Sequence, residues 1–263
     1  MQSERKRVIT GLVLILLLAL VIFLAPVWIL LLAALLLSWL CLWEFLSLFW
    51  PRKQMLFCKA LGLAAALPIV LHSHLGWSLA GILLVLFWIL SLAFLFAYSQ
   101  QDKPAWGEIQ IVLLGLVYIP LAFQFLPELN TPELLLVFLT ALGSDTGAYY
   151  AGTKFGRRKL WPRISPKKSW AGAWGGLFVC LVLTLLLGLS LGSALWYHWL
   201  WLGLLLNLAA QFGDFFESGL KRQLQVKDSS NLLPGHGGFL DRFDSVLLVL
   251  PMYMLCSHFW EFF

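Results

Sequence analysis

Charged residues are scarce in this sequence. Only 12% of its 263 residues are Asp, Glu, Lys or Arg, whereas 61% are hydrophobic. A soluble globular protein has about a quarter charged residues, so the composition excludes an ordinary soluble enzyme. Nucleic acid is also excluded as a partner, because the net charge of +5 comes without a soluble basic domain or a base-stacking module. The sequence therefore predicts an integral membrane protein.

Cysteine motifs and nucleophilic pairs are missing as well. The four cysteines are scattered through apolar segments without a C-x-x-C spacing, which predicts neither a disulfide framework nor a zinc site. The sequence also shows no convincing Ser-His or Cys-His pair for covalent catalysis. Internal repeats and low-complexity segments are absent, so residues 1–263 are interpreted as a single polytopic membrane domain.

Long apolar runs fill most of the chain and predict an all-α helical bundle. Lipid offers the backbone no hydrogen-bond partners, so each span of about 20 residues must be helical. We predict N-terminal spans over 1–132 and a catalytic portion over 133–263, with cytoplasmic loops at 153–170 and 217–244. The nine predicted transmembrane helices cover residues 8–25, 27–49, 57–73, 77–98, 107–126, 133–152, 171–191, 196–216 and 245–262.

The distribution of positive charge predicts the orientation. With nine spans and a cytoplasmic N-terminus, all 18 Lys and Arg residues fall on one side of the membrane. This is the positive-inside pattern, and it puts the C-terminal Phe263 outside. The cationic face suits anionic membrane lipids.

The densest polar stretch runs from Asp214 to Asp244. Asp214 and Glu217 have the spacing of one helical face, and Asp241 and Asp244 have that of another. Between them, Pro234–Gly238 cannot continue a helix, and its glycines let a ligand approach the backbone closely. Carboxylates with cations among them suit a divalent metal such as Mg²⁺ that also holds a phosphate. The alternative is a solvated loop, but acids at membrane borders are costly.

A second polar segment covers residues 144–176. Asp145 lies among apolar and uncharged residues, so its charge is expected within or just inside the bilayer boundary, where it marks a site or makes a helix–helix hydrogen bond. The basic loop that follows presents Lys167 and Lys168 between Ser165 and Ser169, just before a helix. Phosphate groups favour such cations and helix N-termini. Elsewhere, Glu44 near a span end is interpreted as an interfacial structural acid.

Both segments resemble the phosphatidate cytidylyltransferases, also called CDP-diglyceride synthases. Asp145 begins a D-x-x-A-Y element and Ser165 an S-P-K-K-[ST] element of that family, although Ala171 stands where the family usually has Glu. The positions that match the family signature are Ser218, Leu220, Lys221, Arg222, Lys227, Asp228, Ser230, Leu233, Pro234, His236, Gly237, Gly238, Phe239, Asp241, Arg242 and Asp244.

The resemblance implies an enzyme of phospholipid biosynthesis in the bacterial inner membrane, with its site facing the cytoplasm. It would join CTP and phosphatidate to give CDP-diacylglycerol and pyrophosphate with the help of Mg²⁺. The expected metal ligands are Asp214, Asp241 and Asp244, and a second cation such as K⁺ is left open. Further catalytic residues are expected at Asp228, Lys221, Arg222 and Arg242. Substrate contacts are expected from Asp145, Ser165, Lys167, Lys168, Ser169, Ser218, Lys227, His236, Gly237 and Gly238.

Three other functions stay open at this point. A CTP-dependent polyprenol kinase or an archaeal-type lipid cytidylyltransferase would use similar cations on a different acceptor. An ion-coupled transporter also carries intramembrane acids, but here most acids cluster at one membrane face. Product analysis separates the enzymes, because a kinase releases CDP and cytidylyl transfer releases pyrophosphate. A homodimer is left open too.

Overall fold

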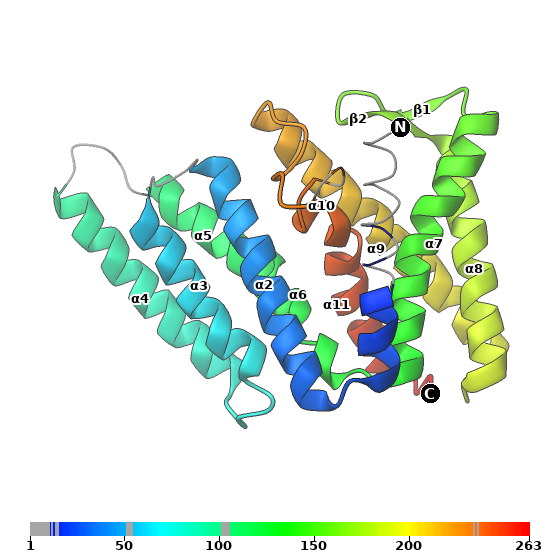
Figure 1. Ribbon diagram of the computed structural model, residues 1–263, viewed down its shortest axis with the longest axis horizontal. Helices are drawn as coiled ribbons and strands as arrows, with labels where there is room; N and C mark the ends of the chain where they lie inside the picture. The colour runs from blue at the N-terminus through cyan, green and yellow to red at the C-terminus, as the bar shows by residue number, and fades with distance from the viewer. Residues whose placement is uncertain are drawn as a thin grey trace.

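The chain forms a bundle of long apolar helices (Figure 1). A computed structural model describes residues 11, 13, 16–50, 55–100, 106–233, 235 and 237–263. One side of the bundle consists of α2 (Val27–Phe49), α3 (Leu56–Leu71), α4 (Leu79–Gln100) and α5 (Trp106–Tyr118). The other side consists of α7 (Thr131–Phe155), α8 (Trp170–Leu191) and α9 (Trp196–Gln223). Between the two sides lie the short α6 (Pro120–Phe123), η1 (Leu126–Glu128) and α10 (Leu240–Phe243), followed by α11 (Val246–Ser257).

The prediction of an all-α polytopic membrane protein is confirmed. Among the described residues, six helices are long and apolar enough to cross a membrane, the first being Val27–Phe49 and the last Trp196–Gln223. The predicted number of nine stays a prediction, because α3 has only 16 residues and α11 only 12. Residues 16–24 are helical as well.

A small hairpin joins α7 to α8, where the sequence predicted only a loop. Strand β1 (Lys159–Trp161) pairs antiparallel with β2 (Ser165–Ser169), and Lys159 lies opposite Ser169. The Arg222 Nε atom at the end of α9 donates a 3.2 Å hydrogen bond to the Ile164 carbonyl oxygen in the hairpin turn. The hairpin is therefore fixed to α9 as well as to the two helices that it joins.

Small residues let α7 and α8 pack closely. A Cβ atom at Gly147 would lie 2.6 Å from the Gly175 carbonyl oxygen, and one at Gly172 would lie 2.8 Å from the Ala148 carbonyl oxygen. No larger side chain fits at these distances, which is typical of close helix pairs in membranes. The close approach brings the N-terminal end of α8 beside the part of α7 that carries Asp145.

The start of α7 is fixed from two directions. Asn130 and Glu133 form a capping box, in which the Glu133 amide donates to Asn130 Oδ1 at 3.0 Å and the Asn130 amide donates to Glu133 Oε2 at 2.7 Å. The other oxygen of Glu133 accepts a 2.8 Å bond from the Tyr253 hydroxyl on α11. These bonds hold α7 against α11, so the polar residues farther along α7 have a defined position.

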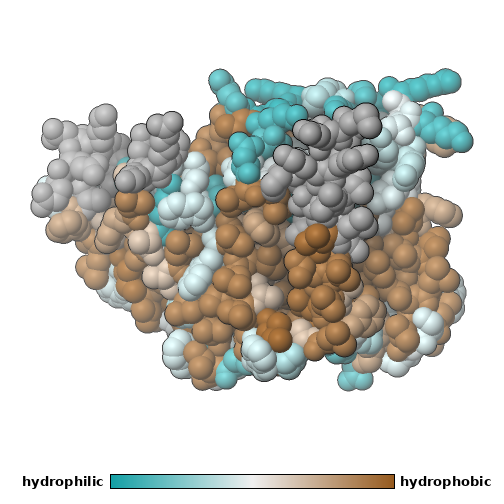
Figure 2. Space-filling model, in the orientation of Figure 1, coloured by the Kyte–Doolittle hydropathy of each residue, from teal (hydrophilic) through white to brown (hydrophobic). Residues whose placement is uncertain are grey.

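Polar residues gather at one end of the molecule. Figure 2 shows hydrophilic residues over the end that carries the β1–β2 hairpin, and hydrophobic residues over most of the surface below it. The C-terminus lies at the opposite end from the hairpin (Figure 1). The polar end is where the two segments singled out in the sequence come together.

Candidate active site

Lys221 links α9 to α10 at the polar end. Asp214, Glu217 and Lys221 lie on α9 with the spacing of one helical face. The Lys221 ammonium lies 2.6 Å from Glu217 Oε2 and 2.6 Å from Asp241 Oδ1. The same ammonium therefore neutralises acids from both halves of the Asp214–Asp244 stretch, and it holds α10 against the end of α9.

Asp241 organises the loop between α9 and α10. Its Oδ2 atom accepts bonds from the Ser229 amide at 2.9 Å, the Ser229 hydroxyl at 2.9 Å and the Gly238 amide at 2.8 Å. Burial alone would raise the pKa of Asp241, but the bonds from Lys221, Gly238 and Ser229 outweigh it and lower the pKa to about 2. Asp241 is therefore ionised at neutral pH, and both of its oxygens are already bonded within the protein.

Glu44 on α2 fixes the same loop from the opposite side. Its side chain is buried and accepts four hydrogen bonds. The donors are the Ser229 hydroxyl at 3.0 Å, the Ser230 hydroxyl at 2.6 Å, the Phe239 amide at 3.0 Å and the Leu240 amide at 2.8 Å. The sequence indicated a structural acid here, but only the fold shows what it binds. We refer to the segment Ser229–Leu240, held by Glu44 and Asp241, as the signature loop.

Two glycines of the signature loop make room for these carboxylates. Gly237 has a φ of +81°, and a Cβ atom there would lie 2.6 Å from Asp241 Oδ2. A Cβ atom at Gly238 would overlap the Ser229 hydroxyl and Glu44 Oε2. Both glycines were predicted to contact substrate, and the structure gives them this packing role. His236, another predicted contact, lies outside the described residues, as does Pro234.

A polar pocket of about 510 Å³ opens between α7, α8, α9 and the hairpin. It brings together residues from both predicted polar segments, although they are far apart in the chain. Ionisable and amide side chains in its wall are Asp145, Lys159, Lys167, Lys168, Gln211 and Asp214. Because cations and carboxylates line one hollow, the pocket can hold a phosphate group together with a cation.

Lys168 and Asp214 form an ion pair in this pocket. The Lys168 ammonium lies 2.6 Å from Asp214 Oδ2 and 4.3 Å above the centre of the Phe215 ring. The Ser218 hydroxyl donates a 3.1 Å bond to the other oxygen, Asp214 Oδ1. The sequence placed Lys168 with substrate and Asp214 with a metal, and the structure places the two side chains in direct contact.

Two more carboxylates lie near Asp214. Asp145 lines the pocket, and its Oδ2 atom lies 3.5 Å from the Ser245 hydroxyl. Asp244 Oδ1 accepts a 2.7 Å bond from the Ser245 amide. Burial, and then the negative charges of Asp214 and Asp145, raise the pKa of Asp244 to about 7. The three acids are thus close enough to repel one another.

Comparison with known proteins identifies the family of the chain. A family model described as the cytidylyltransferase family matches residues 5–260. The chain belongs to the cytidylyltransferase family. Its matched region includes both polar segments and every residue of the pocket described above.

Individual relatives support the same assignment. The chain is 36% identical over 167 residues to a phosphatidate cytidylyltransferase of Bacillus subtilis, a match that covers 60% of this chain and 62% of that protein. A Staphylococcus aureus protein of the same name is 37% identical over 158 residues, covering 58% and 60% of the two chains. These matches span less than two thirds of those relatives. The phosphatidate cytidylyltransferase of Staphylococcus epidermidis is 34% identical over 239 residues, a match that covers 85% of this chain and 88% of that protein.

A Mg²⁺ ion fits the acids of this cytidylyltransferase-family site. No group of three or more His, Cys, Asp or Glu side chains in the described part of the chain has the arrangement of a complete metal site. Mg²⁺ does not require one, because it commonly takes one or two carboxylates and obtains its other ligands from substrate phosphates and water. Asp214 and Asp244 suit that role. Glu217 Oε1 is also buried there without a hydrogen-bond partner among the described residues.

The remaining predicted site residues differ in how deeply they are buried. Ser169 is buried and caps α8, since its hydroxyl accepts a 3.2 Å bond from the Gly172 amide. Ser165 is half-buried at the start of β2. Lys227, Asp228 and Arg242 are exposed. Glu44 and Glu217 are buried acids of the site that the set of predicted site residues left out. The only sequence signal for Glu44 was an acid near the end of an apolar span.

Proposed function

We propose that this protein is a phosphatidate cytidylyltransferase, which joins CTP and phosphatidate to give CDP-diacylglycerol and pyrophosphate. Its site would face the cytoplasm at the bacterial inner membrane. The observation that carries the proposal is the polar pocket at one end of membrane-spanning helices, where Asp145, Asp214 and three lysines line one hollow. Membership of the cytidylyltransferase family and the names of the relatives support the same reaction.

The reaction needs positioning more than proton transfer. A phosphate oxygen of phosphatidate attacks the α-phosphorus of CTP, a new P–O bond forms, and the bond to the β-phosphate breaks to release pyrophosphate. The attacking oxygen is already anionic near neutral pH, so no general base is required. This agrees with a pocket that contains carboxylates and ammonium groups but no Ser-His or Cys-His pair in its wall.

The proposal assigns a role in binding CTP or Mg²⁺ to the charged side chains of the pocket. Lys159 and Lys167 bind phosphate oxygens of CTP by charge-assisted hydrogen bonds. Lys168 holds Asp214 in place through their 2.6 Å contact. A Mg²⁺ ion bound by Asp214 and Asp244 would neutralise charge on the CTP phosphates. Asp241 is less suited to bind metal, because its two oxygens already accept four bonds, from Lys221, Ser229 and Gly238. The oxygens of Asp214 have one such contact each, from Lys168 and Ser218.

Asp241 and Glu44 would act on the signature loop instead of on the substrates. Together they hold the loop at both ends, so the exposed Lys227, Asp228 and Arg242 have a fixed backbone from which to reach phosphates at the pocket rim. Arg222 would hold the hairpin in place through Ile164. A second cation such as K⁺, and a homodimer, stay predictions.

The experiment that tests the proposal is product analysis with purified protein. In detergent micelles with CTP and Mg²⁺, adding phosphatidate should give CDP-diacylglycerol and pyrophosphate in equal amounts. A polyprenol kinase would instead release CDP and respond to polyprenol, and a transporter would release neither product. Release of CDP, or an absence of lipid-dependent pyrophosphate, would overturn the proposal.

A further inference from the structure

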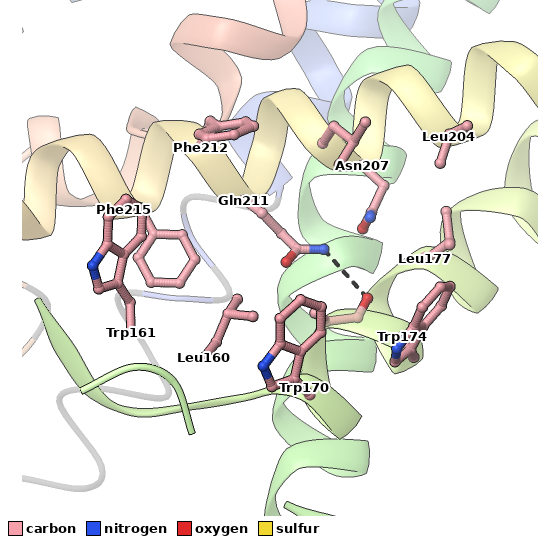
Figure 3. A pocket seen from close by; sticks show the side chains of 12 residues that line it. Leu160, Trp161, Trp170, Trp174, Leu177, Leu204, Asn207, Gln211, Phe212 and Phe215 are labelled. Carbon is pink, nitrogen blue, oxygen red and sulfur yellow. Dashed lines mark hydrogen bonds between the residues drawn. The ribbon is translucent and has the colours of Figure 1, made fainter. Parts of the chain in front are cut away.

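An apolar groove of about 440 Å³ lies between α8 and α9, beside the polar pocket (Figure 3). The side chains that line the groove are largely aromatic and aliphatic, and strand β1 covers one end of the groove. Residues of α8 include Trp170 and Trp174, those of α9 include Leu208 and Phe212, and β1 contributes Trp161. Trp174 is 63% exposed and Phe212 is 58% exposed. Because α8 and α9 are long and apolar enough to cross a membrane, we expect the open side of the groove to face hydrocarbon.

The groove and the polar pocket share part of their walls. Leu160, Ala173 and Gln211 line both hollows. Figure 3 shows Gln211 pointing from α9 toward α8, where its Nε2 atom donates a 3.3 Å bond to the Ala173 carbonyl oxygen. The groove and the pocket that holds Asp214 therefore adjoin each other at Gln211 and Ala173.

Phe215 on α9 lies between the groove and the polar pocket. One neighbour is Trp161 of the groove, with ring centres 5.8 Å apart, and the other is the Lys168 ammonium of the pocket, 4.3 Å from the ring centre. The change from apolar to cationic surroundings thus takes place across a single buried side chain. An amphiphile with an anionic head and an apolar tail matches this change.

We infer that the α8–α9 groove binds an acyl chain of the lipid substrate while the lipid's phosphate lies in the polar pocket. This rests on the proposed function, because it assigns the lipid half of that reaction to particular residues. CTP has no apolar tail to fill the groove, so the nucleotide is not its occupant. The groove orients the lipid, which places its phosphate oxygen beside the nucleotide site.

Packing, rather than removal from water, gives the groove its effect. An acyl chain that enters from the bilayer leaves an environment as apolar as leucine side chains, so little hydrophobic free energy is gained. What is gained is contact with walls of aromatic and aliphatic side chains. Each pair of heavy atoms in contact gains about 0.1 to 0.2 kcal/mol, so about five to eight extra contacts contribute about 0.5 to 1.5 kcal/mol, which is about 2- to 12-fold in an equilibrium constant. Changes to the groove should therefore alter lipid recognition within that range.

Two groove variants and two matched controls test the inference. Leu208→Trp fills the groove and Trp174→Ala widens it. Leu189→Trp on α8 and Trp201→Ala on α9 are the controls, since these residues are 67% and 57% exposed and line neither hollow. Both groove variants should raise the KM for phosphatidate in mixed micelles about 2- to 12-fold. The KM for CTP should not change, and the controls should behave as wild type.

Two kinetic results would overturn the inference. One is an unchanged phosphatidate KM in both groove variants. The other is a CTP KM that rises as much as the lipid KM, because the groove would then affect the whole site and not lipid recognition.

A binding measurement keeps the inference separate from the reaction itself. Phosphatidate with a photoreactive group at the end of one acyl chain should label groove residues of α8 and α9, as mapped by mass spectrometry. A phosphatidylcholine with the same photoreactive chain should label them much less, and unlabelled phosphatidate should compete. Equal labelling by both lipids would mean that the groove is ordinary lipid-facing surface and would refute the inference. Selective labelling without any pyrophosphate release would support the groove and refute the proposed function.

Discussion

Replacing Glu44 by Gln should loosen the signature loop. The Glu44 oxygens accept bonds from two hydroxyls, on Ser229 and Ser230, and from two backbone amides, at Phe239 and Leu240. In Glu44→Gln one oxygen becomes an NH₂ group. Hydroxyls can rotate to accept from it, but a backbone amide cannot, so the Phe239 or Leu240 amide would face another donor.

The size of the effect follows from the bonds that are lost. A hydrogen bond to a charged group contributes about 1.5 to 3 kcal/mol, and a buried amide left without a partner costs about 1 to 3 kcal/mol. Because Glu44 is buried at 1% exposure, solvent does not compensate. We expect local opening of the signature loop to become easier by about 2 to 4 kcal/mol, which is about 30- to 900-fold in its opening equilibrium.

Hydrogen exchange of the backbone amides measures this directly. In purified Glu44→Gln protein, amides of the signature loop should exchange faster, while amides in the middle of α8 should not change. Glu128→Gln is the control, because Glu128 is an exposed acid in η1 that makes none of the bonds described for this loop. Wild-type exchange throughout the signature loop of Glu44→Gln would refute the argument that Glu44 holds it.

Four further predictions follow from the site. Asp214→Asn should lower turnover by about two orders of magnitude or more without changing thermal stability; pyrophosphate assays at saturating Mg²⁺ would contradict this if more than about a tenth of the activity remained. Asp241→Asn, in contrast to Asp214→Asn, should lower the stability of the fold. The pKa of Asp241 falls from 3.8 to about 2 on folding, so its ionised form adds about 2 kcal/mol above about pH 4, and this is lost as the pH falls toward 2; a pH-unfolding profile identical to that of the variant would contradict it. Lys167→Gln should weaken CTP affinity about 10- to 150-fold and change the phosphatidate dependence much less, and an unchanged CTP titration would exclude this contact. A C-terminal reporter that is active only in the cytoplasm should stay silent, whereas a bright signal would mean that the number of spans is even.

Local patterns account for the parts of the fold that the sequence predicted well. Apolar runs near 20 residues predict membrane helices because the bilayer allows little else. The i, i+3, i+7 spacing of Asp214, Glu217 and Lys221 predicts one helical face, and the structure has them on one face of α9. The exact number of spans depends on helix ends and tilts, which composition alone does not fix.

Contacts between distant residues account for what the sequence left out. The Glu44 bond to Leu240 joins residues 196 positions apart, and no local pattern marks such a pair. The same holds for Lys168 and Asp214, which were assigned to different ligands and form one ion pair. The β1–β2 hairpin was missed because its strands have three and five residues, which is too short for a clear alternation of apolar and polar side chains.

The most direct test of the central claim is to follow both products of one reaction. Wild-type protein with CTP, Mg²⁺ and phosphatidate should form CDP-diacylglycerol and pyrophosphate in a one-to-one ratio, and Asp214→Asn should form almost none of either. Formation of CDP with a phosphorylated lipid, or pyrophosphate release that does not depend on phosphatidate, would contradict the account.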